Sequence, residues 1–213
     1  MVAATLTLFG TQGSGSAAVE CALRRCGQDY KLVRASEWEQ DSARDELARL
    51  NPLMQIPTLV LADKTVLTES AAILIHLGLQ FPESGLLPSD ASARAMALRG
   101  LVFIASNCYS AISIGDYPQR WTTDTAAAAY DAVRAAARRQ LHRHWDIFAD
   151  TFDAQPFLSG AAPGALDYLA AVVSKWSGTR AHLADVRPAF AATLKRIEAD
   201  PVVAEVFARH WDK

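Results

Sequence analysis

The chain has 213 residues and a formal net charge of −2, from 21 lysine and arginine residues against 23 aspartate and glutamate residues. Its 51% of hydrophobic residues is enough to form a buried core, which excludes an intrinsically disordered chain. The near-neutral charge, without a long basic run, excludes an electrostatic footprint for nucleic acid or for an anionic membrane, so we expect small molecules or proteins as partners.

The cysteines and the apolar segments favour a cytoplasmic protein. Cys21, Cys26 and Cys108 are too few and too scattered for a disulfide framework or a zinc site, which fits a reducing compartment and predicts no bound metal. Residues 1–10 lack the basic and apolar regions of a secretory signal. No apolar run approaches the roughly 20 residues that a membrane-spanning helix needs, so we expect neither secretion nor membrane insertion.

A strand, a loop of small residues and a helix open the chain. Residues 5–9 alternate polar and apolar side chains, which predicts a β-strand. Residues 10–16 are mostly glycine and serine, which favour turns and helix starts. Apolar side chains recur three, four and seven residues after Val19, the stripe of an amphipathic helix, and Gly27 is placed to end it. Residues 30–33 predict the next strand.

A hairpin and a third helix follow. A short helix is expected to end at Asn51–Pro52, because proline disfavours helix in the residue before it. Residues 58–61 and 65–67 are two short β-type runs separated by a turn, which predicts a hairpin. Thr68–Glu69–Ser70 begins a helix that Pro82 ends.

The composition changes after this point and indicates two domains. Residues 1–82 predict a βαβαββα unit, and residues 83–90, rich in proline, glycine and serine, predict a linker. Residues 91–213 predict an all-α domain, with alanine-rich helical stretches over about 91–115, 123–153, 164–177 and 187–209.

Residues 13–18 also match the G-x-G-x-x-[GA] fingerprint of dinucleotide-binding folds. Glu37 lies at a suitable distance downstream for a ribose contact. That fold requires further parallel strand–helix–strand units, whereas here the next strands are spaced as a hairpin and the rest is helical. The fingerprint is therefore a weak signal, and the same residues read alone are a turn and a helix cap.

A second interpretation starts from Ile56–Pro57. If this bond is cis, the backbone N–H and C=O of Ile56 turn outward, where they can pair with an extended peptide. Glu69–Ser70 stands at a helix N-terminus, whose free N–H groups attract a carboxylate, while the Glu69 side chain can take an ammonium group. These features predict a site for a small zwitterionic peptide.

Together these segments resemble the glutathione S-transferase family. The resemblance covers essentially the whole chain and rests on residues 51–52, 56–59 and 67–73 and on Gly27 after the first helix. It implies an α/β plus all-α fold, in which a thioredoxin-like βαβαββα domain precedes an all-helical domain that contributes a hydrophobic substrate site.

Other positions of the chain can also be compared with the family pattern, and some of them match it while others differ. Residues 157–160 with Asp167 look like the start of the family's buried sixth helix, where we expect Asp167 to be a buried acceptor rather than a catalyst. Met54 stands where many members have glycine, and Gly164 where a serine or threonine usually caps that helix.

The resemblance implies a binding site for glutathione as co-substrate. The Ile56 backbone would pair with the cysteinyl part of glutathione ahead of a cis Pro57, with Gln55 beside it. Glu69 and Ser70 would meet the γ-glutamyl end.

The thiol of glutathione must then be activated. Matching the first helix to serine-type members places their catalytic residue at Gly13 or Ser14, so Ser14 is the expected donor, with Ser16 and Thr11 as alternates. The absence of cysteine and tyrosine between residues 10 and 16 argues against the cysteine-type and tyrosine-type classes. Lowering a thiol pKa by about two units requires roughly 2.7 kcal/mol, and a hydrogen bond to a charged acceptor supplies about 1.5–3 kcal/mol, so one hydroxyl is enough.

The electrophile is expected in the crevice between the domains. The candidate lining is an apolar group with two hydroxyls and one indole, made of Tyr109, Ile112, Tyr117 and Trp121. Tyr109 and Ile112 are also at helical spacing, so a role in the core is the alternative for them.

The predicted function is a cytoplasmic, homodimeric glutathione transferase that conjugates the glutathione thiolate to a hydrophobic electrophile, a detoxification reaction. Two alternatives stay open. The first alternative is a non-catalytic binding or dimerisation protein of the same fold. The second is an enzyme that uses glutathione for isomerisation, dehalogenation or peroxide reduction.

Overall fold

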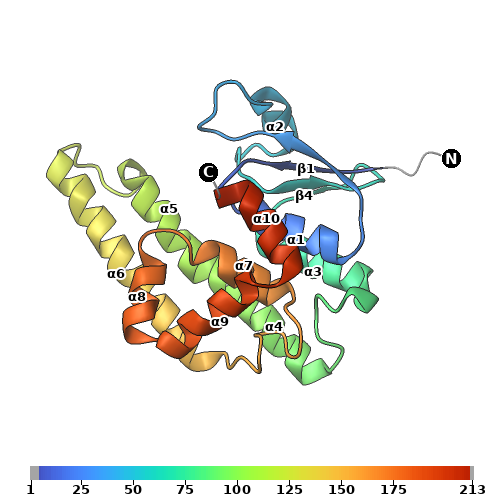
Figure 1. Ribbon diagram of the computed structural model, residues 1–213. Helices are drawn as coiled ribbons and strands as arrows, with labels where there is room; N and C mark the ends of the chain where they lie inside the picture. Colours follow the sequence, from blue (N-terminus) through green and yellow to red (C-terminus); the bar gives the residue numbers. More distant parts are fainter. Residues whose placement is uncertain (1–4, 212–213) are drawn as a thin grey trace.

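A four-stranded mixed sheet organises the first part of the chain in the computed structural model, which describes residues 5–211 (Figure 1). The strands lie in the order β2-β1-β3-β4. The central strand β1 (Leu6–Gly10) is parallel to β2 (Tyr30–Arg34). On its other side β1 pairs antiparallel with β3 (Thr58–Val60), which forms the expected hairpin with β4 (Val66–Leu67). The antiparallel β3 excludes the parallel sheet that a dinucleotide-binding fold requires.

Helices cover both faces of this sheet. The helices α1 (Ser16–Arg25) and α3 (Ser70–Gln80) pack together on one face, and α2 (Arg44–Leu50) lies on the other (Figure 1). Side chains of β1 alternate between the two faces, as strand geometry requires: Leu8 joins the main core, and Phe9 joins a smaller core beneath α2. The arrangement is the thioredoxin-like unit that the sequence predicts.

A helical part follows the short turn η1 (Pro82–Ser84). Its first helix is continuous, because α4 (Ala91–Phe103) leads into the π-helical segment η2 (Ile104–Tyr109) and then into α5 (Ser110–Asp116). By length and composition alone this helix could cross a membrane, but in the structure it packs against α6 and α7. The remaining elements are η3 (Pro118–Arg120), α6 (Ala127–Thr151), α7 (Ala165–Val173), α8 (Thr179–Val186), α9 (Pro188–Glu198) and α10 (Pro201–Trp211).

The last expected helix, over residues 187–209, is two helices in the structure. α10 begins at Pro201, which has no N–H to donate and therefore suits the first turn of a helix rather than its interior. Asp200 accepts a hydrogen bond from the Val202 N–H at 3.0 Å and so supports this new start. The sequence analysis also missed α8, which follows Gly178 in the left-handed region at φ +76°.

Asp167 holds the start of α7, whose residues are all buried. Its carboxylate accepts hydrogen bonds from the N–H groups of Leu158 at 2.8 Å, Ser159 at 2.9 Å and Gly164 at 3.0 Å. This confirms the expected buried acceptor. Glycine is required at position 164, because a Cβ there would lie 2.7 Å from the Leu86 carbonyl oxygen.

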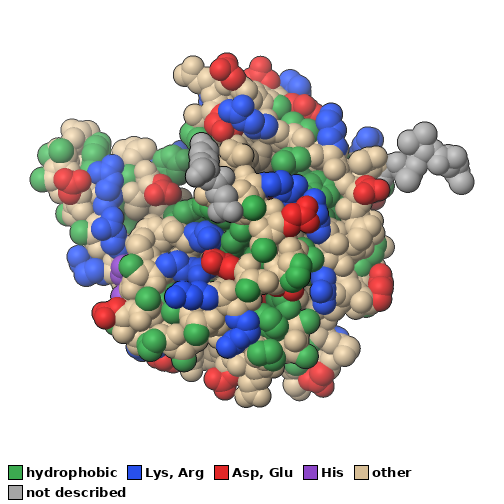
Figure 2. Space-filling view, in the orientation of Figure 1, with side chains coloured by type: hydrophobic (Ala, Val, Ile, Leu, Met, Phe, Trp, Pro, Cys, Tyr) green, Lys and Arg blue, Asp and Glu red, His purple; other side chains and the backbone are tan. Residues whose placement is uncertain are grey.

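Acidic and basic side chains are interspersed on the face that carries α10 (Figure 2). This mixture fits the near-neutral net charge of the chain. In the same view the outline of the molecule is notched between the end formed by α5 and α6 and the α/β part (Figure 2). The notch leads to the candidate site.

Candidate active site

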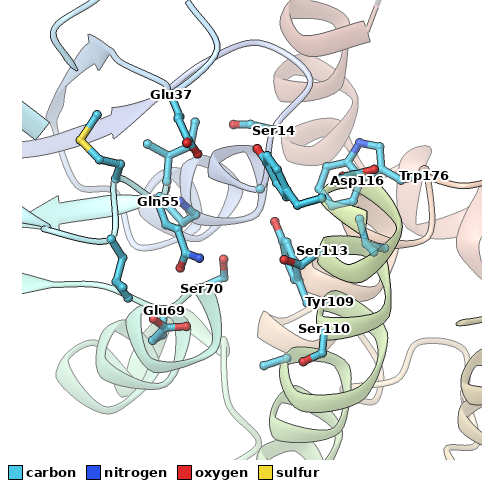
Figure 3. A pocket seen from close by; sticks show the side chains of 18 of the residues that line it. Ser14, Glu37, Gln55, Glu69, Ser70, Tyr109, Ser110, Ser113, Asp116 and Trp176 are labelled. Carbon is cyan, nitrogen blue, oxygen red and sulfur yellow. The ribbon is translucent and has the colours of Figure 1, made fainter. Parts of the chain in front are cut away.

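A cavity of about 850 Å³ lies between the α/β part and the helical part. Figure 3 shows Gln55, Glu69 and Ser70 on one side of it, facing Tyr109 and Ser113 on the helix opposite. All nine residues that the sequence analysis assigned to substrate binding line this cavity: Gln55, Ile56, Pro57, Glu69, Ser70, Tyr109, Ile112, Tyr117 and Trp121. Of the three candidate thiol activators, Ser14 lines the cavity, whereas Ser16 and Thr11 are buried behind it.

The loop before β3 presents unpaired backbone to the cavity. The Ile56–Pro57 bond is cis, and the N–H and C=O of Ile56 form no hydrogen bond within residues 5–211. The buried Asn51 fixes this loop, because its side-chain amide donates to the Gln55 carbonyl at 3.0 Å and to the Thr58 hydroxyl at 3.2 Å. An extended ligand can therefore pair with Ile56 as an added strand pairs with a sheet edge.

The start of α3 supplies charge and free donors beside that loop. Glu69 is the residue before the first turn and has φ +65°, a left-handed conformation that costs a non-glycine residue about 1–3 kcal/mol. Its exposed carboxylate has no hydrogen-bond or ion-pair partner in the described part of the chain. Ser70 adds a hydroxyl at the same helix start, where free N–H groups favour an anion. The pair suits a ligand end that carries both an ammonium and a carboxylate group.

The hydroxyl groups of the loop before α1 bond to the loop itself. Ser14 Oγ donates to the Thr11 carbonyl at 2.7 Å and lies 2.9 Å from Ser16 Oγ. Ser16 Oγ donates to the same carbonyl at 3.3 Å, and Thr11 Oγ1 donates to the Glu39 carboxylate at 2.8 Å. Each of the three hydroxyl hydrogens expected to face a thiol is thus used within the protein.

Tyr109 reaches the N-terminus of α1 from the helical part. A Cβ added at Gly15 would overlap the Tyr109 hydroxyl oxygen and would lie 3.5 Å from Pro57 Cδ. The Tyr109 ring packs on Trp176, with ring centroids 5.6 Å apart. Burial of the hydroxyl raises the pKa of Tyr109, and a hydrogen bond with Ser70 acts in the opposite direction but is weaker. Tyr109 is therefore a neutral phenol in the lining of the cavity.

His210 and Glu20, which the sequence analysis did not assign to the site, support the loop before α1 through hydrogen bonds. The Gly13 N–H donates to His210 Nδ1 at 3.1 Å, and His210 Nε2 lies 2.7 Å from the Glu20 carboxylate. Burial acts to raise the pKa of Glu20, but hydrogen bonds and charge from His210, Tyr30 and Arg209 together lower it. The last helix, α10, thereby fixes the loop that enters α1.

The rim and the helical wall carry further polar residues. Arg120 lies 4.1 Å above the Tyr117 ring and forms an exposed ion pair with Glu37 at 3.5 Å. Asp116 also lines the cavity, and burial raises the pKa of its carboxyl. Glu37, which the dinucleotide interpretation placed on a ribose, is instead at this rim. No spacing in the sequence relates Glu37 to Asp116, Tyr117 and Arg120, because Glu37 comes from a turn far from them in the chain.

Comparison with known proteins shows what this sequence and fold are similar to. Residues 16–80 match the family model described as glutathione S-transferase, N-terminal domain. The chain is 33% identical over 120 residues to the uncharacterized GST-like protein YncG of Escherichia coli (strain K12), a match that covers 56% of this chain and 58% of that protein. The matched stretch is thus less than two thirds of the length of this relative.

Two solved structures are similar over nearly the whole chain. A glutathione transferase homologue from Sulfitobacter, with bound glutathione, has a TM-score of 0.84 at 24% identity and is covered over 97% of its length, with 95% of this chain. A sphingomonad glutathione S-transferase complexed with glutathione has a TM-score of 0.76 at 26% identity, covering 94% of this chain and 96% of that one. With its mixed sheet, its helical second part and the cavity between them, the chain has the fold of glutathione S-transferases, and its residues 16–80 match the N-terminal domain of that family.

Proposed function

We propose that the protein is a glutathione transferase that joins the sulfur of reduced glutathione to a hydrophobic electrophile. The observation that carries the proposal is that two unpaired features, the Ile56 backbone and the Glu69 carboxylate with the start of α3, converge with the N-terminus of α1 on one cavity. The two solved structures compared above contain glutathione, which supports the choice of ligand.

Each part of the tripeptide has a matching feature. Its cysteinyl residue would pair with the N–H and C=O of Ile56, and its γ-glutamyl ammonium and carboxylate would meet Glu69 and Ser70. This leaves the sulfur between Pro57 and Gly15, at the N-terminus of α1, where the positive end of the helix dipole favours an anion. There the thiolate attacks the electrophile, a sulfur–carbon bond forms, and the leaving group departs with the electron pair of the bond it loses.

The electrophile would occupy the helical side of the cavity. Ile112, Tyr117 and Trp121 give that side its apolar and aromatic surface. In this proposal residues 1–82 form the glutathione domain, residues 83–90 link it to the domain of residues 91–213, and the protein is a homodimer. Sedimentation equilibrium should give the mass of two chains.

Calorimetry with reduced glutathione and turnover of a chlorinated nitroaromatic test the proposal together. We expect binding and conjugation by the wild-type protein, and loss of binding in Glu69→Gln, which removes the charge that takes the ammonium group. Glu46→Gln is the matched control, because Glu46 is an exposed residue of α2 outside the cavity.

The two measurements separate the alternatives. Binding without turnover of any electrophile would favour a non-catalytic protein of the same fold, and a screen with peroxides, haloacids and isomerisable double bonds would detect the other reactions. Absence of both binding and turnover in the wild-type protein would contradict the proposal.

A further inference from the structure

The contact between Gly15 and Tyr109 joins the two halves of the molecule where the sulfur of the ligand would lie. A Cβ at Gly15 would overlap the Tyr109 hydroxyl, and the same point is 3.5 Å from Pro57 Cδ. The phenol oxygen, the N-terminus of α1 and the residue that follows the peptide-pairing Ile56 therefore approach the same point. A side chain of any size at position 15 would separate these groups.

The loop before α1 offers no competing hydroxyl hydrogen in this arrangement. Ser14 and Ser16 both donate to the Thr11 carbonyl, at 2.7 Å and 3.3 Å, and Thr11 donates to Glu39 at 2.8 Å. Before one of them could donate to a sulfur, it would have to give up a hydrogen bond that holds the loop. The Tyr109 hydroxyl has no such backbone acceptor in the described chain.

We propose, resting on the function proposed above, that Tyr109 is the catalytic residue whose hydroxyl donates a hydrogen bond to the glutathione sulfur and holds it as the thiolate. The proton of the thiol leaves to solvent, and Tyr109 keeps its own. The electron pair freed on sulfur then forms the bond to the electrophile. The donor thus comes from the helical part, although the tripeptide is bound by the α/β part.

Three features of the structure position the phenol for this task. Tyr109 is the last residue of the π-helical segment η2, and such segments occur frequently at functional sites because they re-aim side chains. Trp176 packs against the Tyr109 ring, and the Ser70 side chain forms a hydrogen bond with the Tyr109 hydroxyl. Because burial raises the pKa of Tyr109, the phenol stays protonated at neutral pH and can act as a donor.

The test is the pKa of enzyme-bound glutathione, read from the ultraviolet absorption of the thiolate as pH is varied. In Tyr109→Phe we expect this pKa to rise by about one to two pH units, and kcat/KM at neutral pH to fall by about 10-fold to 100-fold. Glutathione affinity at acidic pH, where the thiol is protonated, should stay within about twofold, because only the thiolate loses a partner. A merely structural role would weaken that affinity as well.

A control variant and two possible results decide whether Tyr109 has this role. Tyr130→Phe changes a tyrosine of α6 that does not line the cavity and should leave the thiol pKa in place. A Tyr109→Phe protein with the wild-type thiol pKa would overturn the inference, and so would a rise confined to Ser14→Ala. In both of those cases the wild-type protein still binds and conjugates glutathione, so the proposed function would stand; a wild-type protein that binds no glutathione would overturn both.

Discussion

The two walls of the cavity are built from different chemistry. The wall from the α/β part offers mainly backbone: the free N–H and C=O of Ile56 and the starts of α1 and α3. The wall from the helical part offers side chains, among them Tyr109, Ile112 and Trp176. Backbone contacts are kept when most neighbouring side chains are substituted, whereas a wall of side chains changes with single substitutions. The first therefore suits an invariant co-substrate and the second a variable electrophile.

Asn51→Ala should have the largest effect, because it removes the support of the backbone wall. The buried amide donates to Gln55 and Thr58, and its oxygen accepts from the Leu53 N–H at 3.1 Å. Leaving these groups unpaired should lower the free energy of unfolding by about 3 kcal/mol and weaken glutathione binding by about 100-fold. Urea denaturation and calorimetry measure the two effects.

Asn107→Ala is the control in the helical part, on the segment η2 and outside the cavity lining. Its side chain bonds only to Phe103 and Ser106 within its own helix, so we expect a change in stability of about 0.5 kcal/mol or less and unchanged glutathione affinity. Equal losses of glutathione affinity in both variants would show that the tripeptide depends on both walls alike.

Gly15→Ala tests the point where the walls meet. The added Cβ would overlap the Tyr109 hydroxyl, so we expect kcat/KM for conjugation to fall by about 10-fold to 100-fold. In a Tyr109→Phe background the same substitution should cost much less, because the overlapping oxygen is gone. Steady-state kinetics of the double-mutant cycle measures the difference.

The matched glycine substitution is Gly115→Ala on α5. A Cβ there would lie 3.8 Å from Ala137 Cβ, an ordinary contact, and alanine favours a helix. We expect activity to be retained and stability to rise slightly. Additive effects of Gly15→Ala and Tyr109→Phe would contradict the assigned contact.

Glu20→Gln tests how the last helix supports the backbone wall. The folded protein lowers the pKa of Glu20 below its ordinary value of 4.5, so its carboxylate stabilises the fold above that pH and the stabilisation is lost as pH falls through the folded-state pKa. We expect Glu20→Gln to cost about 1–2 kcal/mol at neutral pH. Denaturation at a series of pH values should show the gap to wild type closing on acidification below 4.5; a gap independent of pH would contradict this role.

Sequence patterns predicted residues on both walls of the cavity but not the contacts between distant helices, for a physical reason. The features around Ile56 and Glu69 are local, because prolines, turn residues and helix starts determine the nearby backbone. The contacts Gly15–Tyr109 and Glu20–His210 depend on how helices far apart in the chain pack, and no spacing encodes them. The expectation for Ser14 shows the same limit: the residue lines the cavity, but its hydrogen is directed to Thr11.

Arg120→Ala should have the smallest effect of these substitutions. It tests whether the rim of the cavity contacts the electrophile or glutathione. Arg120 joins the walls through an exposed ion pair with Glu37 at 3.5 Å and lies over the Tyr117 ring. Exposed pairs contribute little, so we expect a loss of about 0.5 kcal/mol in stability and a rise of about twofold to threefold in KM for an aromatic electrophile. KM for glutathione should not change, because the guanidinium contacts Glu37 and the Tyr117 ring rather than Ile56 or Glu69. Arg134→Ala, which breaks an exposed pair with Asp131 on α6, should leave both KM values unchanged. A larger effect of Arg120→Ala on glutathione than on the electrophile would place the tripeptide at the rim and contradict the division between the walls.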